Sequence, residues 1–180
     1  KISSIDDLFR IKTMGFRGEA MASIASVAQV LVRSKRAEDA NGWEFEVWGG
    51  EERPIKPAAV KNGTSISVRN LFYNVPARRQ FLKTNVTELR HILRTVQYAA
   101  LANPQIAFDV VADGERLYSM AADSLKNRIV EIFGQPYKAS LINFEEKTSY
   151  VHIYGFASDP KLAKKSRGEQ FLFVNGRPFQ

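Results

Sequence analysis

The chain has 180 residues, of which 44% are hydrophobic and 25% charged, and its formal net charge is +7. Such a chain is typical of a globular protein with one or two domains. It has no cysteine, only two histidines and no apolar run of membrane-spanning length, so we expect no disulfide, no all-protein zinc site and no membrane segment. The excess of Lys and Arg suits a polyanion such as nucleic acid, although a basic protein without such a partner has the same charge.

A short helix followed by antiparallel strands is predicted in the first third of the chain. Apolar residues recur at positions 21, 24, 25 and 28, which form one face of a helix that begins after Gly18. Strands are expected over 30–34, 43–47 and 64–68, the last two because apolar and polar residues alternate. Asn-Gly and Gly-Gly pairs between the strands predict tight turns.

Helices and strands follow each other in the rest of the chain. Pro76 is expected in the first turn of a helix, with Asn74 as its cap. A longer helix carries an apolar stripe at positions 89, 92, 93, 96 and 100 and ends at Asn103-Pro104. Ser124 is expected to cap a helix over 125–133. Further strands are expected over 106–110, 116–119, 139–144, 149–157 and 171–174. This order predicts an α+β fold, with a domain boundary at about residues 120–123.

The segment Gly15-Phe16-Arg17-Gly18 lies directly before the first predicted helix. Glycine allows sharp turns and close approach of a ligand to the backbone. The start of a helix offers unpaired N–H groups and the positive end of the dipole, which suit phosphate. The spacing therefore has two interpretations, a phosphate-binding loop or a glycine turn leading into a core helix, and spacing alone favours the turn.

Read as whole motifs, three segments resemble the MutL family of DNA mismatch-repair ATPases, which belongs to the GHKL superfamily. They are Thr13 to Ala20 (TMGFRGEA), Asn62 to Val68 with Leu71 to Lys83 (NGTSISV, then LFYNVPARRQFLK), and Phe173 to Arg177 (FVNGR). The three occur in the order that the family has. The resemblance spans nearly the whole chain.

The resemblance implies two parts within the α+β class. Residues 1–122 would be the C-terminal part of a Bergerat-type (GHKL) ATPase α/β sandwich, without its N-terminal nucleotide motifs. Residues 123–180 would be the truncated start of a second, smaller, transducer-like α/β domain of ribosomal-protein-like fold. The family binds ATP with Mg²⁺, and the residues that match its ATP-binding motifs are Lys1, Gly15, Phe16, Arg17, Gly18, Glu19, Ala20, Met21 and Thr64.

The resemblance also assigns roles within that set. The residues from Gly15 to Met21 would position the phosphates and stabilise their charge. Glu19 is expected at the start of the helix, facing away from the phosphates, because a carboxylate is favoured there. The hydroxyl of Thr64 would lie near the adenine as a hydrogen-bond partner.

The chain begins at Lys1 without a methionine and ends at Gln180 directly after an expected strand and turn, so we expect a longer parent protein. In the family, the general-base Glu and the Asn that holds Mg²⁺ lie upstream of the positions matched here. The Lys that reaches the γ-phosphate lies downstream. We therefore expect an ATPase in the full-length protein, and no catalytic residue or metal ligand in the chain itself, which alone would be inactive.

The remaining implications concern partners. The family uses ATP binding and slow hydrolysis to drive N-terminal homodimerisation and to coordinate mismatch recognition by a MutS-family protein with downstream repair. It binds DNA largely independently of sequence, through contacts of basic side chains with phosphates. The candidates here are Arg78, Arg79, Lys83, Lys164, Lys165 and Arg167. The expected location is the cytoplasm, at the nucleoid in a bacterium, or the nucleus in a eukaryote.

Two alternatives remain open. One is another GHKL ATPase, such as a type II topoisomerase subunit, whose motif around the glycine loop has a different wording. The other is a non-catalytic α+β module that binds nucleic acid. The positive net charge and the aromatic residues favour this alternative. A helix with an ENxxDA-like motif and a DxGxG strand upstream of Lys1 would favour an ATPase, and their absence the binding module.

Overall fold

The structure is a computed structural model that describes residues 19–163 and 167–179. The chain forms two compact units, residues 1–84 (unit 1) and residues 85–180 (unit 2). None of the helices in the described part of the chain has the length and apolar content that a membrane-crossing helix needs.

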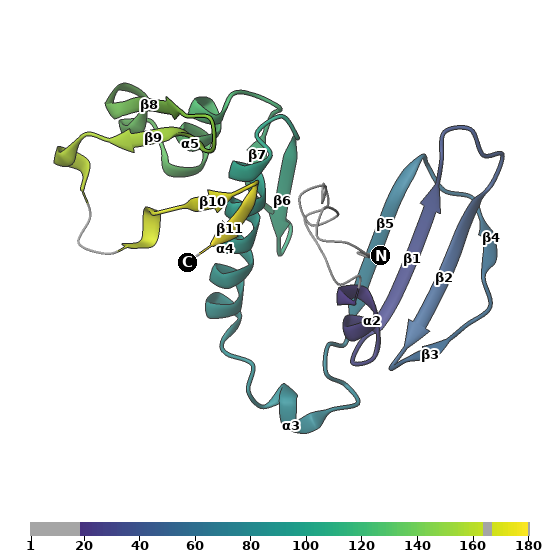
Figure 1. Ribbon diagram of the computed structural model, residues 1–180. Helices are drawn as coiled ribbons and strands as arrows, with labels where there is room; N and C mark the ends of the chain where they lie inside the picture. The colour runs from purple at the N-terminus through teal and green to yellow at the C-terminus, as the bar shows by residue number, and fades with distance from the viewer. Residues whose placement is uncertain (1–18, 164–166, 180) are drawn as a thin grey trace. The chain divides into compact units, whose positions relative to one another are not determined.

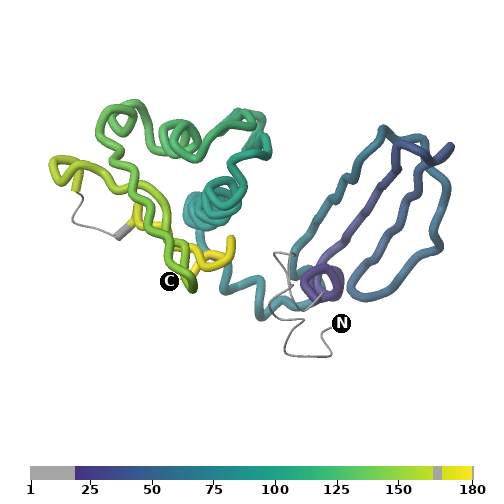
Figure 2. Tube along the Cα trace, turned by 45° about the horizontal axis from the view of Figure 1, so that its top comes forward, coloured from purple at the N-terminus to yellow at the C-terminus, as the bar shows by residue number. Residues whose placement is uncertain are grey.

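Unit 1 is an antiparallel sheet with one short helix against it. Its elements are α2 (Ala20–Ala25), β1 (Gln29–Lys35), β2 (Gly42–Trp48), β3 (Glu51–Glu52), β4 (Lys56–Ala58), β5 (Gly63–Arg69) and α3 (Pro76–Arg79). The strand order is β3-β2-β1-β5, and β4 also pairs with β2. The strands lie side by side in one layer, with α2 at the end of the sheet where β1 begins (Figure 1, Figure 2). The helix and the three strands predicted here are confirmed.

The two faces of this sheet differ in chemistry. On one face, α2 and the loop after it cover a small core whose buried members include Ala25, Val30 and Val47. On the other face, oppositely charged side chains pair across the strands, as Arg33 does with Glu44 at 2.7 Å. Successive residues of a strand point to opposite faces, so the α2 face can be followed along every strand by its register.

Unit 2 combines helices with three two-stranded antiparallel hairpins. Its elements are α4 (Asn85–Ala102), β6 (Phe108–Ala112), β7 (Glu115–Met120), α5 (Leu125–Phe133), α6 (Pro136–Ser140), β8 (Leu141–Lys147), β9 (His152–Ser158), the 3-10 turns Pro160–Leu162 and Arg167–Glu169, β10 (Leu172–Val174) and β11 (Arg177–Phe179). The hairpins are β6–β7, β8–β9 and β10–β11. The predicted α+β class is confirmed.

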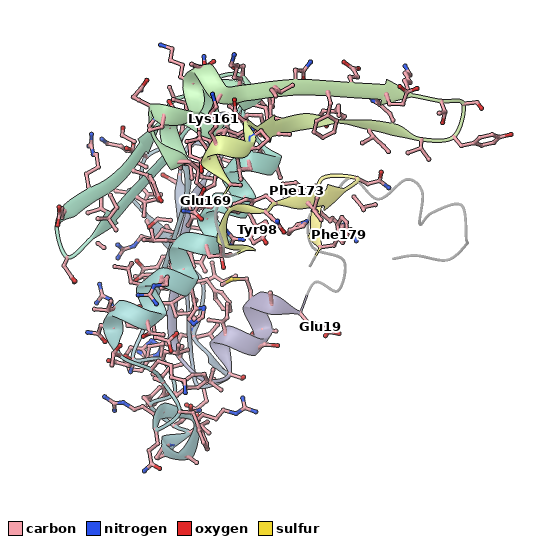
Figure 3. All side chains as sticks on the ribbon, turned by 90° about the vertical axis from the view of Figure 1, so that its left-hand side faces the viewer. Glu19, Tyr98, Lys161, Glu169, Phe173 and Phe179 are labelled. Atoms are coloured by element: carbon pink, nitrogen blue, oxygen red, sulfur yellow. The ribbon has the colours of Figure 1, made fainter. Side chains whose placement is uncertain are left out.

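An aromatic cluster joins α4 to the end of the chain within unit 2. The ring centroid of Tyr98 lies 4.8 Å from that of Phe171 and 5.9 Å from that of Phe173. Tyr98 and Phe173 are labelled in Figure 3. Phe133 of α5 extends the cluster, with its ring centroid 5.4 Å from that of Phe171. These contacts explain why α4 is grouped with the elements that follow it.

Three local predictions differ from the structure. Asn74 does not cap α3: the N-cap is Val75, without a side-chain hydrogen bond, and Asn74 instead bonds across unit 1 to Ser26. The strand expected from residue 139 begins at Leu141, because the preceding residues form α6 with Pro136 in its first turn. Ile92 of the predicted apolar stripe is 56% exposed, since the described parts of unit 2 leave this side of α4 uncovered.

The boundary between the two compact units falls between Thr84 and Asn85. The sequence, by contrast, predicts a domain boundary near residue 122. The division at residue 84 separates two compact groups of residues. The division near residue 122 separates two domains that the family resemblance implies. The domain ranges 1–122 and 123–180 therefore stay a prediction.

Candidate functional site

The start of α2 carries the described part of the predicted phosphate contacts. Glu19 is the N-cap, at the start of the helix as expected, and its side chain is exposed and makes no capping hydrogen bond (Figure 3). The first turn closes where Ser23 N–H donates to the carbonyl of Glu19 at 2.9 Å. The N–H groups of Ala20 and Met21 precede that of Ser23, which is the first to bond within the helix, and both residues are exposed. The N–H groups at this end of α2 can donate to a phosphate oxygen.

The predicted contacts Lys1, Gly15, Phe16, Arg17 and Gly18 lie outside the described residues. The same is true of Lys164 and Lys165 among the predicted DNA contacts.

The second motif holds the carboxyl end of α2 in place. Phe72 N–H donates to Val27 O at 2.7 Å, and Asn74 Nδ2 donates to Ser26 O at 2.9 Å. Both acceptors belong to the turn between α2 and β1. The sequence predicted Asn74 as the cap of the helix that begins near Pro76, and this bracing role was missed. The amide of Asn74 was the available signal, but its partner lies 48 positions away.

The Gly49-Gly50 turn braces the same end of α2 from another side. Gly49 N–H donates to Ala28 O at 3.0 Å, and Gly50 N–H donates to Ala25 O at 2.9 Å. Gly49 has φ +60, and a Cβ atom there would lie 2.6 Å from the hydroxyl of Tyr73. Glycine is therefore required by both the backbone conformation and the close approach of the second motif.

Thr64 lies on the same face of the sheet as α2. In the β1–β5 ladder it pairs with Ser34, and the next pairs on that face are Ile66 with Val32 and Val68 with Val30. Val30 is buried beneath α2, so the whole row belongs to the α2 face. The hydroxyls of Thr64 and Ser34 are 2.8 Å apart and share a hydrogen bond.

Thr64 and α2 mark opposite ends of this face. Ser34 follows the first residue of β1, Gln29, by five positions, which is a span of roughly 17 Å at ~3.4 Å per residue. Two exposed apolar side chains, Ile66 and Val68, lie along the ladder between the ends. Among the described residues, the predicted adenine contact Thr64 and the helix α2, which begins with the predicted phosphate contacts Ala20 and Met21, therefore lie on one face at a distance from each other. A nucleoside triphosphate, with its base at one end and its phosphates at the other, suits such an arrangement.

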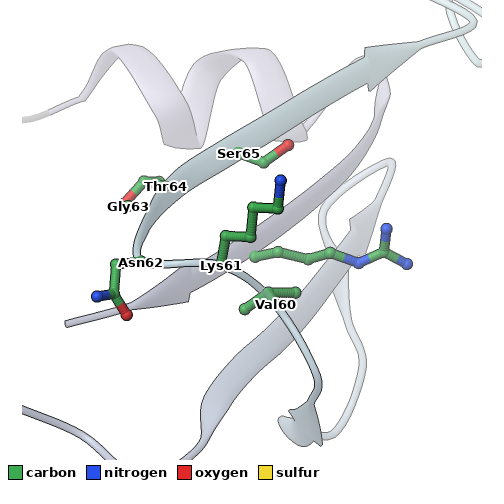
Figure 4. Close-up of a pocket in the computed structure, with 7 residues that line it drawn as sticks. Val60, Lys61, Asn62, Gly63, Thr64 and Ser65 are labelled. Atoms are coloured by element: carbon green, nitrogen blue, oxygen red, sulfur yellow. The ribbon is translucent and has the colours of Figure 1, made fainter. Parts of the chain in front are cut away.

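A shallow hollow of about 330 Å³ opens at the beginning of β5 (Figure 4). It is lined by Arg33, Val60, Lys61, Asn62, Gly63, Thr64 and Ser65. Arg33 and Ser65 pair in the β1–β5 ladder one position away from Ser34 and Thr64, so their side chains leave the opposite face. The part of the hollow that Arg33 and Ser65 line therefore lies on the face opposite α2, whereas Thr64 belongs to the α2 face.

The described basic candidates lie in different units. Arg78 and Arg79 are exposed at the end of α3, and within the described part of the chain no ion pair involves either of them. Lys83 follows in unit 1, also exposed. Arg167 opens a 3-10 turn in unit 2. Phe81, which is 79% exposed, lies beside the arginine pair.

No group of three or more His, Asp or Glu side chains that could hold a metal ion occurs among the described residues. No ligand for Mg²⁺ is therefore assigned within them.

Known proteins match the chain along its length. A family model described as "DNA mismatch repair protein, C-terminal domain" matches residues 129–180. The DNA mismatch repair protein MutL of Chloroherpeton thalassium is 43% identical over 100% of the chain, and that of Christiangramia forsetii is 47% identical over 98%. The chain spans only 28% and 29% of the lengths of these two relatives.

Solved structures agree with these relatives. The Aquifex aeolicus MutL ATPase domain complexed with ADP superposes with a TM-score of 0.76 and 28% identity, over 99% of this chain and 67% of that one. The N-terminal domain of a DNA repair protein, with a TM-score of 0.77 and 24% identity, shares the fold over 95% of this chain and 57% of its own. The expected Bergerat-type architecture agrees with these neighbours. The chain belongs to the MutL family of DNA mismatch repair proteins and corresponds to a segment of their ATPase region.

Proposed function

We propose that this chain supplies part of the ATP site of a mismatch repair protein. One observation carries the proposal: α2, whose start is exposed, and the side chain of Thr64 lie on one face of the sheet, at opposite ends of the β1–β5 ladder. The related MutL ATPase domain of Aquifex aeolicus was solved in complex with ADP, which supports the same type of ligand here.

The residues of this chain would bind and orient the nucleotide. Backbone N–H groups at the start of α2, together with those of Gly15 to Gly18, would hold phosphate oxygens in the positive field of the helix. Thr64 would hydrogen-bond near the adenine through its hydroxyl. The second motif and the Gly49-Gly50 turn would keep α2 at its place on the sheet. When bound, Mg²⁺ would neutralise phosphate charge, with ligands outside this chain.

In the full-length protein, ATP binding and slow hydrolysis would drive N-terminal homodimerisation and coordinate mismatch recognition with downstream repair. The partners would be DNA, bound with little regard to sequence, and a mismatch-recognition protein of the MutS family. Arg78, Arg79 and Lys83 in unit 1, and Lys164, Lys165 and Arg167 in unit 2, are the proposed phosphate contacts. The location would be the cytoplasm, at the nucleoid in a bacterium, or the nucleus in a eukaryote.

The two alternatives have less support. Eight MutL relatives match 98–100% of the chain, which disfavours a topoisomerase subunit. A non-catalytic module would bind DNA through its basic residues, but it would not account for the shared face of α2 and Thr64.

The test is a nucleotide titration of the full-length protein with Thr64→Val and Ser65→Ala. Thr64→Val keeps the shape of the side chain and removes its hydroxyl, so ATP affinity should fall by about 5- to 20-fold, the effect of one lost hydrogen bond. Ser65→Ala removes a hydroxyl from the opposite face one position away, and ATP affinity should stay unchanged. Equal affinities for wild type and folded Thr64→Val would remove Thr64 from the site. Failure of the wild type to bind ATP would overturn the proposal.

A further inference from the structure

Arg128 is a buried cation at the junction of the two predicted domains. It lies in α5 with 0% of its side chain exposed, six positions after the predicted boundary and one before the residues that the family model matches. No other charged or polar residue in the described part of the chain is buried. Its guanidinium must therefore find its partners within the protein.

Those partners come mainly from the predicted first domain. The Nη2 atom donates to the carbonyl oxygens of Pro104 at 3.0 Å and Ile106 at 2.9 Å, and also to that of Ala121. These carbonyls lie just after α4, just before β6 and just after β7. One side chain thus fastens α5 to both ends of the β6–β7 hairpin and to the end of α4.

Not every nitrogen of the Arg128 guanidinium has a hydrogen-bond partner among the described residues. Nε pairs with Glu131 of the same helix at 3.2 Å, but Nη1 is buried and has no hydrogen-bond partner among the described residues. A buried guanidinium with an unpaired donor contributes less to stability than a well-packed apolar side chain would. Fixing one particular arrangement of the segments explains this residue better than general stabilisation does.

A second arginine makes contacts in the reverse direction. Arg94 lies in α4, in the predicted first domain, and donates to the carbonyl oxygens of Gly168 and Gln170. Its guanidinium carbon lies 3.9 Å from the ring centroid of Phe171. All three partners belong to the predicted second domain.

We propose that Arg128 and Arg94 are positioning residues that couple the two predicted domains, each reaching from one domain to the backbone of the other. Through them, α4 and the β6–β7 hairpin keep a fixed geometry relative to α5 and residues 168–171. A movement of α4 or the β6–β7 hairpin in one predicted domain would then move α5 and residues 168–171 in the other, and the reverse. The consequence for ATP turnover rests on the proposed function, whereas the fixed geometry does not.

The geometry is tested by pulsed electron spin resonance on the 180-residue chain, whose lack of cysteine allows labels at chosen pairs of introduced cysteines. Labels at the exposed positions Thr95 of α4 and Lys126 of α5 report across the boundary. Arg128→Met should widen the distance distribution about twofold or more, because local opening becomes populated. Lys138→Met, which removes a charge from exposed α6, should leave the distribution narrow. A folded Arg128→Met chain with an unchanged distribution overturns the proposal.

A second pair keeps the proposal testable if Arg128→Met fails to fold. With labels at Thr95 and the exposed Val174, Arg94→Met should widen the distribution, and Arg94→Lys should not restore it, since Lys lacks the planar fork that binds two carbonyls and stacks on a ring. A narrow distribution in Arg94→Met would then overturn the proposal.

In the full-length protein, Arg128→Lys should reduce the change in ATP turnover that added DNA causes, and leave basal turnover within about twofold of wild type. An unaltered DNA effect in this variant would contradict coupling through Arg128. A wild-type protein without any ATP turnover would refute the proposed function, while the label distances would still decide the geometry.

Discussion

At Gly49, both the backbone conformation and the packing require glycine. Gly49→Ala places a Cβ atom 2.6 Å from Tyr73 Oη and 3.0 Å from Asn74 Nδ2, at a φ of +60. Relief requires both side chains to move, and movement of Asn74 loses its hydrogen bond to Ser26. We expect the free energy of unfolding to fall by about 2 kcal/mol, from backbone strain and the lost bond together.

Gly50→Ala is the matched control for this prediction. It has φ +91 in the same turn, but the nearest atom to its Cβ would be Ser26 Cα at an ordinary 3.9 Å. It should show the backbone strain alone, about 1 kcal/mol. Urea unfolding followed by tryptophan fluorescence measures both, because the chain's two tryptophans lie in β2 and report on unit 1. Equal losses in the two variants would show that the contact with the second motif is unimportant.

The carboxylate of Asp123 should make the stability of the protein depend on pH. This carboxylate accepts the backbone N–H of Ser124 at 2.6 Å and Nδ2 of Asn127 at 2.9 Å. These bonds, that from Ser124 above all, lower the pKa of Asp123 below its ordinary value of 3.8. Because the folded-state pKa is depressed, the stabilisation is present above the unfolded pKa and is lost as pH falls through the folded pKa.

Asp123→Ala should therefore destabilise the chain above the ordinary pKa of Asp123 and flatten the decline of stability at lower pH. Urea midpoints followed by circular dichroism, from pH about 2.5 to 5, measure this effect. Glu146→Ala removes an exposed carboxylate of β8 and is the control. Parallel pH curves for wild type and Asp123→Ala would contradict a role of this carboxylate at the start of α5.

The α3 element carries the prediction about DNA. Arg78→Glu with Arg79→Glu should lower DNA affinity and reduce the magnitude of the log–log salt slope by roughly 0.9 for each lost phosphate contact. The loss should be similar on two unrelated duplexes, because phosphate contacts carry no base information. Neither arginine belongs to the apolar stripe of α4, so circular dichroism should show an intact fold.

Lys56→Glu with Lys61→Glu is the control for the arginine pair, since it changes the net charge of unit 1 equally. An equal effect of the two double variants would point to net charge instead of α3. If the slope of the folded arginine variant stays at the wild-type value, the pair is structural, and the DNA face has to be sought around residues 161–167.

The 180-residue chain, without the rest of the full-length protein, should turn over no ATP above background. The family's general base and metal-holding residues lie upstream of the motifs matched here, and positioning of phosphates alone does not supply an activated water. Phosphate release by the purified 180-residue chain measures this directly. Turnover that Arg17→Ala abolishes would show that a complete site lies within these residues.

Features that depend on neighbours along the chain follow from the sequence alone. Ser124 caps α5, with its hydroxyl accepting from Asn127 N–H, and Gly134 ends that helix at φ +101. Asp113 and Gly114 both take positive φ in the turn between β6 and β7, as an Asp-Gly pair between two strands favours. Alternation in β2 and β5 also predicted strands correctly. Caps, turns and side-chain periods are decided within a few residues, which is why local patterns sufficed.

Contacts between groups far apart in the chain depend on how the whole chain folds. Asn74 had a local role open to it as a cap for α3, yet its amide bonds to Ser26 instead. The sequence did not single out Arg128, since its three carbonyl partners depend on how α5 lies against the β6–β7 hairpin. The face that Thr64 shares with α2 follows from strand register, and a shift of one residue would have moved it to the other face. Long-range register and burial depend on contacts between segments far apart in the chain, which no local pattern specifies.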